Sequence, residues 1–373
     1  MTGNGKSSNL LDPLILYAEE PERRVTILDT TLRDGSYAID FKFSLDETRL
    51  IASALENAGI KQIEVGHGWG LNAESAGLGK AAHTDEEYIT ATRQALKKAK
   101  FGCFFIPGVA RAGDLVKARD LGMDFVRIGN NITEYKLQEN YINVAKNLGF
   151  NVSSNLLKSY VVSPKEFAER AKDVGEMGAD VVVLVDSAGG MTPTEVKRYV
   201  RDAKRLTRVP LGFHGHDNLG LANANALSAV EEGATVIDAT LQGIGRSAGN
   251  SITESLTLLL DKGGWITEID PYSLFDAGER FIRPLLLNNG GYDPVDFILG
   301  VEKFHSSFVP MIKKIASEYG LDYRRLISEI AKVDRIRPTP ELMREVAERF
   351  LTSKIILPLE DIENPDEPIE RFA

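Results

Sequence analysis

The feature that most constrains this fold is a regular alternation of short apolar runs with longer amphipathic segments. The intervening segments have helical spacing, and several begin with Ser or Thr followed three residues later by Glu, a capping-box signature, and end at Gly. Eight strand–helix units over about 240 residues predict a (β/α)8 TIM barrel. The predicted strands are 25–30, 62–66, 101–108, 124–130, 150–157, 180–186, 210–216 and 235–243.

An open, doubly wound α/β sheet is the alternative for this alternation. Such a sheet is expected to carry a Gly-rich phosphate-binding turn after its first strand, and TLRDGS at 31–36 is not one. We therefore predict a TIM barrel over 25–268. From 269 to 355 the pattern is helical without strands between, which predicts an all-helical C-terminal domain. Residues 1–24 are predicted to be a leader, and 356–373 an acidic tail.

Composition limits the classes of partner. The formal net charge of −10 argues against a nucleic acid or an anionic membrane surface as the main partner. The sequence has no apolar run of 18 residues or more, so no membrane span is expected. The single cysteine, Cys103, excludes an internal disulfide and favours a reducing compartment. Because no signal-peptide pattern is found at the N-terminus, we expect a cytoplasmic protein.

A metal site is predicted at one end of the barrel. His214 and His216 end the seventh predicted strand as HGH, and residues two apart on a strand face the same way. Asp34 follows the first strand, and the carboxyl ends of barrel strands converge on one mouth. Two imidazoles and a carboxylate there form a divalent-metal site with open positions. The alternative is a polar turn that happens to be rich in histidine.

Arg33 lies next to Asp34, at the end of the first predicted strand. A guanidinium beside a metal ion can stabilise an oxyanion as its charge develops, because Arg cannot be neutralised. A structural salt bridge at the barrel mouth is the alternative role for this residue.

Several motifs together resemble the DRE-TIM metallolyase superfamily, and within it the 4-hydroxy-2-oxovalerate aldolases (4-hydroxy-2-oxoacid pyruvate-lyases). They are LDTTLRDG, GHGWGL followed by AAHTDEEY, VDSAGG, FHGHDNLGLANANALSAVEEGATVIDATLQGIG, SAGN and the SSF of the helical region. The likeness covers about residues 25 to 340. TLRDG or HxH alone would be a weak signal, whereas their combination is specific.

The resemblance implies a TIM barrel with a helical C-terminal domain and a class II pyruvate aldolase activity. Asp34, His214 and His216 would hold Mn²⁺, or Mg²⁺ or Co²⁺ in its place, which chelates a 2-oxo acid. Arg33 would stabilise the pyruvate enolate produced by reversible retro-aldol cleavage of a 4-hydroxy-2-oxo acid to pyruvate and an aldehyde. The resemblance also implies substrate-binding roles for further residues, namely Ser187, Asn250 and His67, each of which could instead be a turn or loop residue.

One departure from the family concerns a catalytic pair. The aldolases carry a histidine where this chain has Tyr37, and a tyrosine where it has His305, before SSF. We predict that the pair has exchanged positions, so that His305 is the base and Tyr37 its hydrogen-bonding partner. The helical domain would then contribute to the active site. Altered or lost chemistry is the alternative.

Two other functions remain open at this stage. One is a Claisen-type condensation of an acyl-CoA with a 2-oxo acid, as in isopropylmalate and homocitrate synthases, which share the barrel and metal site. The other is a non-catalytic barrel with a helical binding module. For the aldolase, the resemblance also suggests an acylating aldehyde dehydrogenase partner, and we expect a homo-oligomer.

Overall fold

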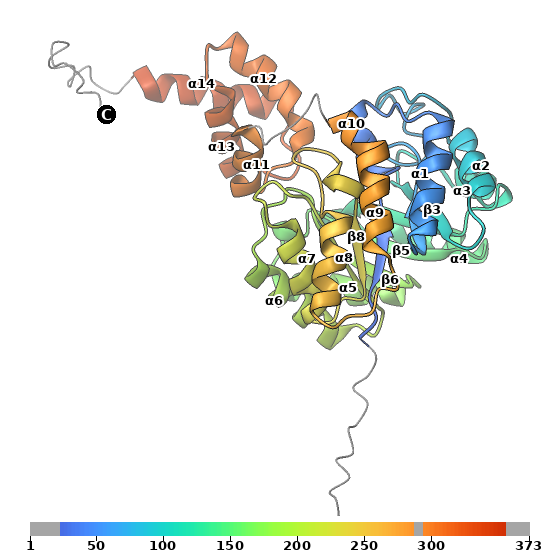
Figure 1. Ribbon diagram of the computed structural model, residues 1–373. Coiled ribbons are helices and arrows are strands. Elements are labelled where there is room, and N and C mark those ends of the chain that lie inside the picture. Colours follow the sequence, from blue (N-terminus) through green and yellow to red (C-terminus); the bar gives the residue numbers. More distant parts are fainter. Residues whose placement is uncertain (1–22, 287–293, 356–373) are drawn as a thin grey trace, which may run out of the picture.

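The computed structural model describes residues 23–286 and 294–355 (Figure 1). Its eight strands form one closed parallel barrel in which each strand pairs with the next in sequence and β1 pairs with β8. This confirms the predicted TIM barrel. The strands are β1 (Thr26–Asp29), β2 (Gln62–Glu64), β3 (Lys100–Phe105), β4 (Phe125–Asn131), β5 (Asn151–Leu157), β6 (Val181–Asp186), β7 (Leu211–Gly215) and β8 (Val236–Ala239).

The last strand, β8, differs most from its predicted range. β8 ends at Ala239 rather than at 243, because Leu241–Gly243 form a 3-10 turn, η4. Gln242 within this turn has a φ of 54°, a left-handed conformation that ends extended pairing. The polypeptide therefore turns early, and the loop after η4 crosses the mouth of the barrel.

Helices surround the barrel, and four of them begin directly after the Ser or Thr of a predicted capping box. Capping boxes form at the predicted Ser or Thr residues, in which the hydroxyl accepts from the Glu amide three residues later and the Glu carboxylate accepts from the cap amide. The helices are α1 (Leu45–Asn57), α2 (Asp85–Ala95), α3 (Ala112–Asp120), α4 (Glu139–Asn147), α5 (Pro164–Glu176), α6 (Pro193–Leu206), α7 (Ala222–Glu231) and α8 (Thr253–Lys262).

The buried apolar side chains of the described residues form two separate hydrophobic clusters. The larger one fills the barrel and its surrounding helices, and it includes Leu274 and Ala277 of α9, which packs on α1. The smaller cluster lies among α11 to α14, which Figure 1 shows gathered beside the barrel in orange and red. The helices after the barrel are α9 (Pro271–Ala277), α10 (Arg283–Leu286), α11 (Pro294–Glu302), α12 (Val309–Glu318), α13 (Tyr323–Val333) and α14 (Pro340–Ile355).

The helices α11 to α14 and the turn η6 (Ser306–Phe308), which we call the helical domain, dock on loops at the carboxyl ends of the strands. Asn218, after β7, donates to the Asp296 carbonyl at 3.1 Å, and Ser247, after β8, donates to the Asp296 carboxylate at 2.7 Å. These contacts fix the helical domain against the mouth of the barrel.

The structure also bears on the predicted termini and on membrane insertion. Apart from Arg23 and Arg24, the predicted leader lies outside the described residues, as does the predicted acidic tail. Within 23–286 and 294–355, none of the helices combines the length and the apolar character needed to cross a membrane.

Candidate active site and metal centre

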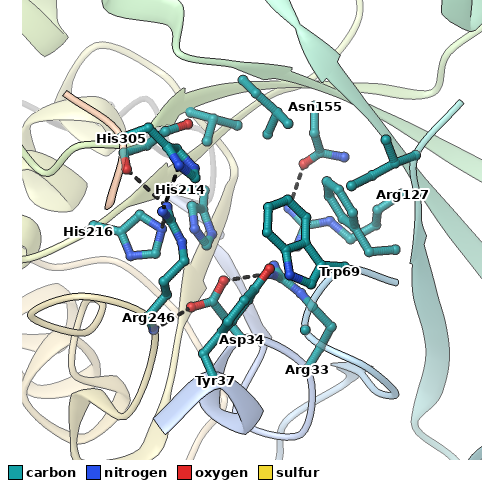
Figure 2. A pocket seen from close by; sticks show the side chains of 16 residues that line it. Arg33, Asp34, Tyr37, Trp69, Arg127, Asn155, His214, His216, Arg246 and His305 are labelled. Carbon is teal, nitrogen blue, oxygen red and sulfur yellow. Dashed lines mark hydrogen bonds and ion pairs between the residues drawn. The ribbon is translucent and has the colours of Figure 1, made fainter. Parts of the chain in front are cut away.

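A pocket opens at the carboxyl ends of the strands, beneath the helical domain (Figure 2). Most of the predicted site residues come together in it, although they are far apart in the sequence. Its lining includes Arg33, Asp34, Tyr37, Trp69, Arg127, Asn155, Ser187, His214, His216, Arg246 and His305.

The predicted metal ligands converge at the base of this pocket. Asp34 is the first residue of the 3-10 turn η1 (Asp34–Ile39), His214 is in β7, and His216 follows β7. One ligand atom from each of the three residues lies within 4.8 Å of the others, and all three side chains are buried. One carboxylate and two imidazoles are a donor set that suits a divalent transition-metal ion.

The contacts around the three ligands orient them for metal binding. His214 Nδ1 lies 2.9 Å from Asp238 Oδ2, and His216 Nδ1 lies 3.1 Å from the Gly249 carbonyl oxygen. Both contacts leave the Nε2 lone pair of the neutral ring directed at the pocket; that of His216 contacts the Arg246 guanidinium at 2.9 Å, a place that a metal ion would take instead. Asn250 Nδ2 donates to Asp34 Oδ1 at 2.9 Å, while the buried Asn250 Oδ1 has no hydrogen-bond partner. The residues present therefore fit a metal ion.

The protonation states of the ligands support this fit. Burial, and next to it the Arg246 cation, lowers the pKa of His216 well below its usual value. Burial alone would raise the pKa of Asp34, but neighbouring positive charge, that of Arg33 first, holds it well below its usual range. At neutral pH the imidazole is thus neutral and the carboxylate ionised, the forms that bind a metal.

Arg33 is held in place by carboxylates on two sides. Its Nε donates to Glu64 Oε2 at 2.8 Å, and its Nη1 pairs with Asp34. The guanidinium also lies over the ring of Phe104, 5.0 Å from its centroid. Arg33 is therefore both a salt-bridge residue and a fixed cation beside the metal ligands, so its two predicted roles coexist.

A buried ionic network that our sequence reasoning missed connects Arg33 with His214. Arg127 Nη1 donates to Glu64 at 3.0 Å, and Arg127 Nη2 contacts Asp238 at 2.5 Å and Asn155 at 2.8 Å. The chain of contacts runs from Arg33 through Glu64, Arg127 and Asp238 to His214. Glu64, Arg127 and Asp238 each lie between two apolar residues of a predicted strand, and that position was the available signal, because a charge inside a barrel must be paired.

Tyr37 and His305 both line the pocket, as the exchange hypothesis requires. Tyr37 packs edge-on against Trp69, with ring centroids 5.9 Å apart. Burial, and next to it the cations Arg246 and Lys158, lowers the pKa of His305 well below its usual value. His305 Nδ1 accepts from the Ser307 amide at 3.2 Å. In the described residues, Tyr37 and His305 make no hydrogen bond to each other.

The three predicted substrate-binding residues other than Arg33 occupy different positions. Ser187, after β6, lines the pocket, and its Oγ accepts from the Lys158 amide at 3.0 Å. Asn250 contacts the ligand Asp34, as described above. His67 is not among the lining residues: it stacks on Phe41 at 3.9 Å, and its Nδ1 accepts from the Trp69 amide. His67 thus supports the loop that presents Trp69.

Arg246 is a second residue that sequence reasoning missed. It lies in the loop after η4, and its backbone amide donates to Asp34 Oδ1 at 3.2 Å. Its guanidinium contacts His216 Nε2 at 2.9 Å and donates to Ser306 Oγ at 2.8 Å. Figure 2 shows it on the opposite side of Asp34 from Arg33. A lone Arg in a Gly-rich loop gave no sequence signal, because only the crossing of this loop over the mouth places it in the site.

Comparison with known proteins agrees with this geometry. The sequence profile of the HMGL-like family matches residues 24–280, which include the whole barrel. The chain belongs to the HMGL-like family. The resemblance predicted from its motifs is confirmed.

Curated relatives extend the similarity beyond the barrel. The chain is 38% identical to 4-hydroxy-2-oxovalerate aldolase of Carboxydothermus hydrogenoformans over 87% of its own length and 97% of that protein. It is 40% identical to 4-hydroxy-2-oxovalerate aldolase of Pelotomaculum thermopropionicum, over 83% and 91% of the two chains. Among solved structures, the carboxyl transferase domain from Rhizobium etli pyruvate carboxylase shares the fold, with a TM-score of 0.71 and 17% identity over 93% of this chain and 63% of that one.

Proposed function

We propose that this protein is a divalent-metal-dependent pyruvate aldolase, a carbon–carbon lyase that cleaves a 4-hydroxy-2-oxo acid reversibly to pyruvate and an aldehyde. The observation that carries the proposal is the convergence of Asp34, His214 and His216 in one pocket with the fixed cation of Arg33. The names of the curated relatives agree with it.

The metal centre and Arg33 have complementary roles. A divalent ion held by Asp34, His214 and His216 supplies Lewis acidity to the 2-oxo acid. Arg33 stabilises the negative charge on the enolate oxygen that remains when the C3–C4 bond breaks, because its guanidinium is fixed by Glu64 before the substrate arrives. Ser187 contacts the substrate carboxylate, and Asn250 holds Asp34 in its ligating position.

We assign proton transfer at the 4-hydroxyl to His305, with Tyr37 as its hydrogen-bonding partner. The depressed pKa of His305 keeps it neutral near pH 7, as a base must be, whereas burial raises the pKa of Tyr37 far above neutrality. The Ser307 amide, which donates to Nδ1, selects the ring form whose proton is on Nε2. His305 therefore takes the hydroxyl proton through Nδ1, after that contact opens. His67 acts on substrate binding indirectly, through the Trp69 loop.

Further proposals concern the setting of the enzyme. We propose Mn²⁺ as the native ion, with Mg²⁺ or Co²⁺ as substitutes, and a cytoplasmic homo-oligomer. An acylating aldehyde dehydrogenase that takes up the aldehyde is the proposed partner. These assignments are supported by the resemblance to the aldolases.

Solvent exchange tests the proposed function. The protein, stripped with a chelator and reloaded with Mn²⁺, is incubated with pyruvate in D₂O without any CoA ester, and the methyl protons are followed by NMR. We expect exchange that requires the metal, and pyruvate release from 4-hydroxy-2-oxo acids. Absence of exchange together with thiol release from an acyl-CoA and a 2-oxo acid would show a condensing enzyme instead.

A further inference from the structure

The guanidinium of Arg246 differs from the two others that line the pocket. Arg33 pairs with Asp34 and Glu64, and Arg127 pairs with Glu64 and Asp238, so each has carboxylate partners. The Arg246 guanidinium instead contacts neutral acceptors: the Ser187 carbonyl at 3.0 Å, Ser306 Oγ and the imidazoles of His216 and His305. No carboxylate of the described residues forms an ion pair with it within 4.0 Å. A half-buried cation of this kind favours an anion from outside the protein.

A second cation, Lys158, lies near Arg246, although it is not among the residues that line the pocket. Lys158 follows β5, is 7% exposed, and its ammonium donates to the Ile336 carbonyl and lies 5.3 Å from the centroid of the Phe308 ring. It too forms no ion pair with a carboxylate in the described parts of the chain. Lys158 and Arg246 both contact η6, one through Phe308 and the other through Ser306. Burial, and next to it the charge of Arg246, lowers the pKa of Lys158 to about 8, so its ammonium is charged at pH 7.

We infer that Arg246 and Lys158 form a binding site for an anionic group, a carboxylate or a phosphate, on the aldehyde half of the substrate. This inference rests on the proposed aldolase function and specifies its substrate class: a 4-hydroxy-2-oxo acid with a second anionic group beyond C4. The Arg246 guanidinium and the Ser306 hydroxyl that it contacts provide donors to such a group, and Lys158 adds positive charge nearby.

Geometry places this site on the aldehyde half rather than on the pyruvate half. Arg246 contacts His305 at 3.4 Å, and its guanidinium lies 6.0 Å from the centroid of the Tyr37 ring. In the proposed reaction, these two residues act on the hydroxyl that becomes the aldehyde oxygen. Arg33, beside the enolate position, lies on the other side of Asp34 (Figure 2). The Nη1 side of the guanidinium, which contacts Ser306 and His305, thus faces the departing aldehyde, whereas Nη2 contacts the Ser187 carbonyl and His216.

Paired aldehydes test the inference, with the Mn²⁺-loaded protein in the synthetic direction. Butanal is compared with succinic semialdehyde, and glyceraldehyde with glyceraldehyde 3-phosphate, each with pyruvate. We expect kcat/KM to be at least about tenfold higher for the charged member of one pair, because a site built for a polar group discriminates against the analogue that lacks it. The pair that shows the preference identifies carboxylate or phosphate as the group.

Variants connect the preference to the two residues. Arg246→Met and Lys158→Met should each reduce the ratio of charged to neutral kcat/KM toward one, and Arg246→Lys should restore part of it. Lys303→Met is the matched control, because Lys303 also joins the helical domain to the barrel but is paired with Glu195. This control should keep the ratio of the unmodified protein.

Deuterium exchange of pyruvate without an aldehyde distinguishes a failure of this inference from a failure of the proposed aldolase function. Lys158→Met should retain exchange, since no contact joins Lys158 to Arg33 or to the metal ligands. Loss of exchange in this variant, or equal kcat/KM for charged and neutral aldehydes in the unmodified protein, would overturn the inference. Absence of exchange in the unmodified protein would instead count against the aldolase function itself.

Discussion

At the scale of single residues, Asp238 orients the ring of the predicted metal ligand His214. Its carboxylate receives the Nδ1 proton of His214 and also pairs with Arg127. We predict that Asp238→Asn weakens Mn²⁺ binding about 10–100-fold, because the orientation and proton position of the His214 ring are no longer enforced. Titration of the stripped protein followed by the EPR signal of free Mn²⁺ measures the affinity. Asp46→Asn, at an exposed position in α1, is the control. Equal affinities in all three proteins would contradict this role for Asp238.

His305 should affect chemistry and leave metal binding unchanged. His305→Ala is expected to lower kcat for retro-aldol cleavage about 10²–10⁴-fold, the usual contribution of a general base. Because burial depresses the pKa of His305, the loss of activity caused by protonating it should begin below pH 6.5, and this acidic limb should disappear in the variant. A pH profile of the residual activity, together with the Mn²⁺ titration, checks both statements. Retained turnover in the variant would contradict the hypothesis that His305 and Tyr37 have exchanged roles.

At the scale of secondary-structure elements, β1 ends at a buried carboxyl group, that of Asp29, whose ionisation affects stability. Burial raises the pKa of Asp29 to about 7 from 3.8, although the Thr31 amide and the Thr253 hydroxyl donate to it. The folded protein thus holds a proton there that the unfolded chain loses near pH 4. The extra proton stabilises the folded protein. This contribution to the free energy of unfolding is complete below pH 4 and is lost as the pH rises to 7, at about 1.4 kcal/mol per pH unit.

The measurement is the free energy of unfolding in urea at several pH values. The unmodified protein should lose stability from pH 4 to 7 relative to Asp29→Asn, which cannot ionise but keeps an oxygen for the Thr31 amide. Parallel curves for the two proteins over this range would show that Asp29 is ionised in the folded state throughout.

The elements also show which structural features can be predicted from residues close together in the sequence and which depend on distant ones. The strands and capped helices were predictable, because periodicity and Ser/Thr–Glu spacing act within a few residues. The metal triad was predictable because the barrel brings all strand ends to one mouth. The partners of Arg127 were not, since they depend on the pairing of β4 with its neighbours and on contacts across the barrel interior. The course of the loop after β8, which aims Arg246 at His216, depends on left-handed residues such as Gln242 and Ser247.

At the scale of the whole molecule, the active site depends on the docking of the helical domain. The metal ligands and Arg33 belong to the barrel, whereas His305 and Ser306 belong to the helical domain. At Gly190, after β6, the two units approach closely: a Cβ at this position would lie 2.1 Å from the Gly300 carbonyl oxygen in α11. Docking therefore requires a residue without a side chain at 190.

Gly190→Ala should consequently separate two activities of one enzyme. The added methyl group pushes α11 away, so His305 and Ser306 leave the pocket and aldol cleavage falls at least about tenfold, because catalysis is sensitive to displacements of about 1 Å. Metal-dependent exchange of the pyruvate methyl protons should fall much less, because the predicted metal ligands and Arg33, which stabilise the enolate, belong to the barrel. Hydrogen–deuterium exchange of the α11 amides reports the undocking directly. Gly113→Ala in α3, whose Cβ meets nothing within 4 Å, is the control and should change neither activity. If α11 lost its protection in Gly190→Ala while aldol cleavage was retained, the helical domain would not contribute to catalysis, and His305 would lose its place in the mechanism.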